Sequence, residues 1–219
     1  MTLEIMPVSD SNRALVGDMA RRYVAEVATQ AGGTISTESL LDCVDRLANY
    51  WGLTPAAGAW PPLWRGFPFL LRIDGRPGGF ALVKRLGTGP ATFDMGEFFV
   101  VRQHRRRGIG RRAATWLFDC LAGSWEVRQM PTNARAQGFW RRVIADYTGG
   151  AFIETRETFA AYDAREFVVQ RFATARPRPQ AASGGAIPPA TPLRHSRGVP
   201  PNRARNALLK CDRSLKPQR

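Results

Sequence analysis

Cysteine and histidine are scarce in this sequence, which has three cysteines and two histidines among 219 residues. The cysteines Cys43, Cys120 and Cys211 form no CxxC pair, and so few histidines complete no zinc-ligand set. An odd, scattered cysteine count also argues against a disulfide framework and fits a reducing compartment. We therefore expect no metal site and no disulfide scaffold.

Long apolar runs are also missing. No stretch approaches the ~18 apolar residues of a membrane span, and the N-terminus has neither the charged start nor the apolar run of a signal peptide. We therefore expect a cytoplasmic protein with no membrane segment.

Acidic residues are few, 18 against 32 basic residues, for a formal net charge of +14. From Thr174 onward the chain has ten basic residues and a single acidic one. The end of the chain therefore carries about +9 and the rest about +5. The segment 173–219 is rich in Pro, Ala, Gly, Ser and Arg and can bury little apolar surface. We expect a folded domain at 1–172 and a disordered basic tail at 173–219.

Apolar periodicity in the domain predicts an α+β fold with a mixed sheet and flanking helices. The turn Asp74-Gly75 between two apolar runs is a strong hairpin signal. A loop rich in tryptophan, from Trp51 to Pro68, would serve as an acceptor lid or as a stacking surface. The predicted strands are 3–7, 69–73, 79–83, 92–101, 124–129, 151–155 and 166–172, and the predicted helices are 9–29, 37–50, 108–121 and 134–144.

An arginine-rich turn with two glycines follows the apolar run 98–101 and precedes a helix. Gly108 and Gly110 allow a tight turn and close approach of a ligand, and the free N–H groups of a first helical turn attract anions. No Lys-Ser/Thr pair follows, which excludes a P-loop, and Ala113 in the third glycine position excludes a dinucleotide fingerprint. The segment predicts a pyrophosphate site, with a solvated arginine-rich turn as the alternative.

Arg105-x-x-Gly108-x-Gly110 resembles the Arg/Gln-x-x-Gly-x-Gly/Ala signature of the GNAT superfamily of N-acetyltransferases. The segment 133–140, Asn-Ala-Arg-Ala-Gln-Gly-Phe-Trp, is similar to a second family segment, Asn-x-x-Ala-x-x-Phe-Tyr, and 139–154 resembles a bacterial branch of the family. The resemblance covers roughly residues 3–172. It implies the GNAT fold, with a mostly antiparallel sheet and a strand pair that splays at the cofactor site, and acetyl-CoA as cosubstrate.

The resemblance also implies roles for particular residues. The backbone of the Phe98-Phe99-Val100 strand, at Phe98 and Val100, would hydrogen-bond the acetyl carbonyl and the pantetheine amides, and Asn133 would contact the pantetheine arm. Main-chain N–H groups would cradle the pyrophosphate along Arg105, Arg106, Arg107, Gly108, Ile109, Gly110 and Arg111.

Trp140 stands where the family usually has a tyrosine that protonates the departing thiolate. An indole N–H cannot deliver that proton, so Trp140 is either a packing residue or a cofactor contact. Either catalysis does without that acid or another residue supplies it, and Tyr147, nearby in the sequence, is the candidate.

Asp94 and Glu97, on the strand before the turn, are candidates for the general base that an attacking amine requires. Histone-type relatives carry a glutamate four residues before the Phe98 position, which is where Asp94 stands. Glu97 adjoins the acetyl-contacting residues but faces the opposite side of a regular strand, a parity that a bulge would change. Both carboxylates stay open here, beside the alternative that neither acts.

Two functions are consistent with these features. The first is acetyl transfer from acetyl-CoA to a primary amine of a small molecule or peptide, by a monomer or homodimer. The alternative is a GNAT-fold binding module with weakened chemistry, whose basic tail contacts nucleic acid or another polyanion.

Overall fold

A computed structural model describes residues 1–30, 33–34, 66–87, 89, 91–160, 164–174 and 216–217. The predicted helix at 37–50, the tryptophan-rich loop up to residue 65 and nearly all of the basic tail lie outside the described residues. No helix in the described part of the chain is long and apolar enough to cross a membrane.

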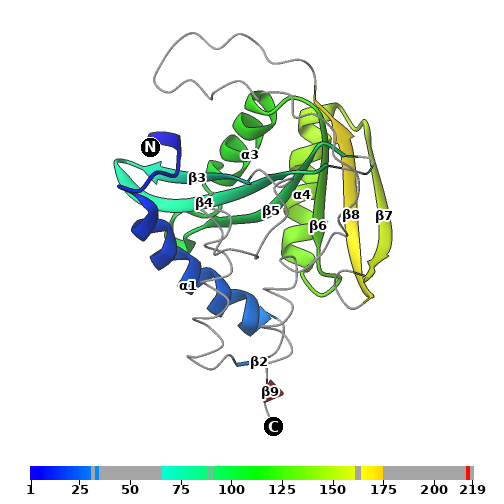
Figure 1. Cartoon of the computed structure of the whole chain (residues 1–219), viewed down its shortest axis with the longest axis horizontal. Coiled ribbons are helices and arrows are strands. Elements are labelled where there is room, and N and C mark those ends of the chain that lie inside the picture. Colours follow the sequence, from blue (N-terminus) through cyan, green and yellow to red (C-terminus); the bar gives the residue numbers. More distant parts are fainter. Residues whose placement is uncertain are drawn as a thin grey trace.

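The described residues form one seven-stranded sheet in the order β1-β3-β4-β5-β6-β8-β7 (Figure 1). Every neighbouring pair is antiparallel except β5 and β6, which are parallel. The strands are β1 (Leu3–Pro7), β3 (Gly66–Ile73), β4 (Arg76–Arg85), β5 (Phe93–Val100), β6 (Ser124–Gln129), β7 (Phe152–Phe159) and β8 (Arg165–Ala173). The helices are α1 (Arg13–Gln30), α3 (Ile109–Cys120) and α4 (Ala134–Thr148), and η2 (Arg102–His104) is a short 3-10 turn. Two-residue strands β2 (Gly33–Thr34) and β9 (Lys216–Pro217) pair separately.

The α+β fold with a mixed, mostly antiparallel sheet is therefore confirmed. The hairpin of β3 and β4 turns at Asp74 and Gly75, both left-handed with φ of 49° and 74°, as a two-residue hairpin turn requires. Helix α4 runs one turn past the predicted end at Ile144, to the C-cap Gly149, whose φ is 63°.

Helices cover both faces of the sheet because apolar side chains alternate along the central strands (Figure 1). Phe80, Leu82 and Phe99 pack with α1 on one face. Ala81 and Val83 belong to the core that α3 and α4 complete on the other face. The two faces are called the α1 face and the α3/α4 face below.

Strand β5 has a bulge at Gly96, and its hydrogen-bonded pairing with β6 ends at the same point along the strand. Leu82 of β4 pairs with Glu97, but the next residue, Val83, pairs with Met95, so Gly96 is the extra residue. On the other edge of β5, the parallel pairing with β6 stops at Met95. In the described part of the chain, the last four residues of β5 are thus paired with β4 and leave the edge toward β6 open.

Candidate active site

The open edge of β5 presents backbone hydrogen-bonding groups to the gap between β5 and β6. The Val101 N–H donates to the Gly78 oxygen at 2.9 Å, which fixes the alternation of the antiparallel ladder with β4. Phe99 and Glu97, two and four residues earlier, turn their backbone groups the same way. Phe98 and Val100 consequently turn their N–H and C=O groups toward the gap.

The arginine-rich turn ends at Gly108, the N-cap of α3, in the left-handed conformation with φ of 75°. Arg106 is left-handed too, with φ of 58°. Gly108 supplies no side-chain cap, and no protein acceptor within the described ranges receives an N–H from residues 106–111. These donors lie at the positive end of the α3 dipole, beside the open edge of β5, where an anion would be favoured.

Arg105 has a different role from the other arginines of the turn. Its N–H donates to the Arg102 oxygen at 3.2 Å, so it is not one of the available donors. Its Nε donates to the Val100 oxygen at 2.6 Å, and its Nη2 lies 2.6 Å from a carboxylate oxygen of Glu26 on α1. The guanidinium also lies 5.2 Å from the centre of the Phe99 ring. Arg105 thus ties the turn to β5 and α1.

Gly110 allows α3 to pack closely on α4. A Cβ at this position would lie 3.2 Å from two ring carbons of Phe139, tighter than most Cβ contacts, so the ring would have to shift. The predicted role of Gly110 in close approach of a ligand is therefore accompanied by a second one, close approach of a helix.

Asn133 caps α4 through its side-chain oxygen, which accepts the Ala136 N–H at 3.0 Å. Since β5 and β6 are parallel, Asn133 lies at the same end of the sheet as Gly108. Its position is compatible with the predicted pantetheine contact.

Trp140 is a core residue, 6% exposed. Its ring centre lies 5.1 Å from that of Phe98, 4.9 Å from that of Phe139 and 6.4 Å from that of Phe118. Phe98 and Phe139 stack on each other at 6.0 Å. These rings join α4 to the open half of β5, which is the packing role considered from the sequence.

We expect Trp140→Phe to change activity little, because an indole in this position packs rather than transfers a proton. Trp140→Ala should lower the free energy of unfolding by ~3–5 kcal/mol, as a large buried ring is lost. Thermal unfolding and the rate of thiol release measured on both variants check this. A severe loss of turnover in Trp140→Phe, with stability and cofactor affinity intact, would contradict a packing role.

The structure does not bring Tyr147 to the turn. Gly110 meets Phe139, while Phe118 packs on Tyr147 at 5.3 Å, so α3 and α4 run side by side in one direction. Tyr147 lies eight residues beyond Phe139 on α4, or ~12 Å along the helix. Its hydroxyl donates to Asp119 at 2.8 Å, and burial together with this bond raises the pKa of Tyr147. A phenol so placed and so weakly acidic is poorly suited to protonate a leaving group at the gap.

Asp94 and Glu97 lie on the same face of β5 because the bulge at Gly96 adds one residue between them. A regular strand would place them on opposite faces. Glu97 reaches α1, where the Tyr23 phenol donates a short hydrogen bond to its carboxylate. Glu97 is partly exposed, whereas Asp94 is 3% exposed.

The environment of Glu97 holds its pKa near neutrality. Partial burial raises the pKa of Glu97 to about 7, and the Asp94 charge acts in the same direction. The hydrogen bond from Tyr23 and the charge of Lys84 act in the opposite direction. A carboxylate with this pKa can accept a proton at neutral pH and release it again.

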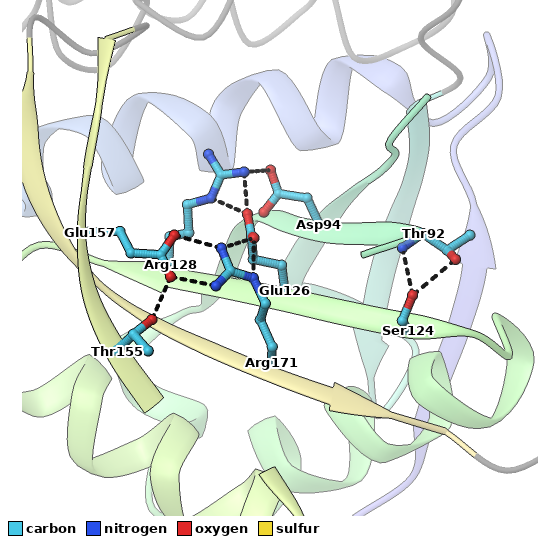
Figure 2. Close-up of polar contacts among 8 residues, drawn as sticks. All are labelled: Thr92, Asp94, Ser124, Glu126, Arg128, Thr155, Glu157 and Arg171. Carbon is cyan, nitrogen blue, oxygen red and sulfur yellow. Dashed lines mark hydrogen bonds and ion pairs between the residues drawn. The ribbon is translucent and has the colours of Figure 1, made fainter. Parts of the chain in front are cut away.

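Asp94 belongs instead to a network of ion pairs on the α1 face of β5, β6 and β8 (Figure 2). Asp94, Glu126 and Arg171 occupy one row across these three strands. Arg128 lies 3.9 Å from Asp94 and pairs closely with Glu126.

Arg171 completes this network toward the sheet edge. It donates to Glu126 at 2.8 Å and to Glu157 of β7 at 2.7 Å. Thr155 also donates to Glu157 (Figure 2). The bond from Arg171 has the larger effect, and together the two bonds lower the pKa of Glu157 to about 2. The compensated charges favour a structural role for Asp94, and Glu97 is the carboxylate whose pKa lies nearer neutrality.

Sequence reasoning missed the network and Tyr23. Glu126 and Arg128 alternate with the buried Trp125 and Val127 on β6, and charged residues at alternate positions of an apolar strand were the available signal. Tyr23 falls within the predicted helix 9–29, and nothing in the sequence of that helix distinguishes it from the apolar residues around it. Among the described residues, no group of three or more His, Cys, Asp or Glu side chains could hold a metal ion.

The sequence profile of the acetyltransferase (GNAT) family matches residues 41–144 of the chain. Comparison of the sequence with curated proteins found no match. The profile covers the arginine-rich turn, the open half of β5 and most of α4.

Solved structures of acetyltransferases are similar to this chain. One from Thermus thermophilus is 18% identical with a TM-score of 0.56, over 79% of this chain and 97% of that one. One related to the histone acetyltransferase HPA2, from Corynebacterium glutamicum, is 13% identical with a TM-score of 0.53, over 81% and 99%. The aminoglycoside acetyltransferase AAC(6')-Ib, in complex with ribostamycin and coenzyme A, is 12% identical with a TM-score of 0.53, over 79% and 94%. At identities this low, the structural similarity shows a common fold.

Proposed function

We propose that this chain, which belongs to the GNAT superfamily of acetyltransferases, transfers the acetyl group of acetyl-CoA to a primary amine, with Glu97 as the general base. The observation that carries the proposal is the bulge at Gly96. It opens the edge of β5 toward β6 and turns Glu97 to the α1 face at the same point. A thioester held along the open edge and a base beside it would then meet at one place.

The residues present fit acetyl-CoA. The N–H groups of residues 106–111 suit the pyrophosphate, and Arg106 and Arg107 are exposed beside them. The N–H and C=O of Phe98 and the N–H of Val100 suit the pantetheine amides and the acetyl carbonyl, which would take the place of a neighbouring strand; the Val100 C=O already accepts the hydrogen bond from Arg105. The aminoglycoside acetyltransferase of similar fold was solved with coenzyme A, which supports this assignment.

The reaction needs one proton acceptor and one proton donor. Acetyl-CoA supplies an activated acyl group, whose carbonyl carbon forms the new C–N bond as the C–S bond breaks. Glu97 takes one proton from the amine nitrogen, and the thiolate sulfur takes up a proton from solvent. Because a thiol has a pKa near ~8.5, its anion is a good leaving group, and we propose that no protein acid replaces the missing tyrosine.

Thiol release tests the proposed function. Purified chain, acetyl-CoA and a panel of amines, including aminoglycosides, polyamines and peptides with free amino termini, should release free thiol for at least one amine. Mass spectrometry of that amine should show one added acetyl group. Tight binding of acetyl-CoA without acetylation of any amine on the panel would favour the binding module.

A further inference from the structure

Tyr23 is placed to control the base. It lies on α1, and its ring is fixed between two strands, edge-on to Phe80 of β4 at 5.6 Å and tilted against Phe99 of β5 at 5.6 Å. From this position the phenol O–H donates to the Glu97 carboxylate. The contact joins residues 74 positions apart in the sequence.

The same face of α1 makes a second polar contact with the site. Glu26, three residues after Tyr23, pairs with Arg105 at 2.6 Å, and Arg105 in turn donates to the Val100 oxygen. Residues three apart on a helix share one face. Helix α1 therefore holds the base through Tyr23 and the anion-binding turn through Glu26.

Other charged and titratable groups also lie on the elements around Glu97. They are Glu26 on α1, Lys84 on β4, Asp94 on β5, and Glu126 and Arg128 on β6. Lys84 and Asp94 act on Glu97 through charge and in opposite directions. Arg128 and Glu126 pair with each other beside Asp94. Tyr23 contributes a directed hydrogen bond, which fixes one carboxylate oxygen.

We infer that Tyr23 is a positioning residue for amine activation: its hydroxyl holds the Glu97 carboxylate in one orientation. The inference rests on the proposed function of Glu97 as base. Tyr23 does not itself take up the proton, since burial first, and then the charge of Glu97, raise its pKa well above the usual value.

The sign of the effect follows from the hydrogen bond. The bond from Tyr23 stabilises the ionised carboxylate and lowers the pKa of Glu97, so its removal raises that pKa. Tyr23→Phe keeps the ring and removes the hydroxyl. We expect the pKa of Glu97 to rise by about one pH unit, which corresponds to about a five-fold loss of kcat/KM at pH 7 that is recovered at higher pH.

Two measurements on the full chain test the inference. An NMR titration with labelled glutamate carboxyls gives the pKa of Glu97 without turnover, in the wild type and in Tyr23→Phe. The pH profile of kcat/KM for thiol release gives the kinetic counterpart. The matched control is Val24→Ala, which loosens the packing of α1 at the next residue, 1% exposed in the core between α1 and the sheet.

We expect both profiles to move to higher pH in Tyr23→Phe and neither to move in Val24→Ala. An active Tyr23→Phe enzyme whose Glu97 pKa moves by less than about 0.3 unit, or one that loses activity equally at every pH, would overturn the inference alone. If Tyr23→Phe shifts the pKa of Glu97 but the wild-type chain acetylates no amine, the proposed function is overturned, and with it the catalytic role of Tyr23 and Glu97.

Discussion

Replacing Glu97 by glutamine is expected to lower kcat/KM for amine acetylation about 100- to 1000-fold at pH 7.5, within the range usual for loss of a general base. The amide has the shape of the carboxylate but takes up no proton. Its Oε1 can still accept the Tyr23 hydrogen bond, so the fold should be retained. Affinity for acetyl-CoA, measured by calorimetry, should stay within about three-fold of wild type, because the proposed pyrophosphate contacts do not involve Glu97.

Asp94→Asn is the matched comparison, since it makes the same chemical change three residues away on the same face of β5. Asp94 is buried in the ion-pair network, so this variant should lose thermal stability and keep most of its kcat/KM. The reverse result, with Asp94→Asn inactive and stable and Glu97→Gln active, would identify Asp94 as the general base.

Replacing Gly108 by aspartate is expected to weaken acetyl-CoA binding by about 100-fold or more. A Cβ added at Gly108 has no protein atom within 4 Å, so the substitution itself is not blocked by packing. It places a negative charge among the N–H donors that lead into α3, where the pyrophosphate would bind. Calorimetric titration with acetyl-CoA measures the effect.

Gly108→Asn is the control for this change. Asparagine has nearly the same shape and adopts a left-handed conformation about as readily as aspartate, which the φ of 75° at this position requires. It should therefore reproduce the backbone cost without the charge and lose less than about ten-fold in affinity. Equal losses in both variants would show that shape rather than charge decides binding, and wild-type affinity in Gly108→Asp would refute the anion site.

The elements of the fold with a local sequence signal were predictable. The strand at 3–7 and the strand at 124–129 have the predicted bounds, and the hairpin turn at Asp74 follows from the residues that a left-handed turn needs. The helix after Gly108 was indicated by its periodicity and by the glycine that begins it. In each case, neighbouring residues alone determine the conformation.

The choice between the two carboxylates was not predictable, because it depends on a bulge. A glycine inside a strand, such as Gly96, indicates a possible bulge. Whether the chain bulges there depends on the pairing of β5 with β4 and on where its pairing with β6 ends. The sequence also could not assign Tyr147, which is close to Trp140 along the chain but bonded to Asp119. Both cases depend on contacts between distant segments, as does the bond between Tyr23 and Glu97.

The central claim, that Glu97 accepts the proton of the attacking amine, is tested most directly by one comparison over pH. The rate of thiol release is measured for the wild type and for Glu97→Gln with the same amine from about pH 5.5 to 9. The titration of the amine affects both enzymes equally. The rate of the wild type divided by that of Glu97→Gln therefore reports the ionisation of Glu97 alone. We predict a ratio that rises through an apparent pKa of about 7 and then becomes constant, as expected for a base that must be ionised. A ratio that is independent of pH would contradict the account, because Glu97 would then affect the reaction without taking up a proton.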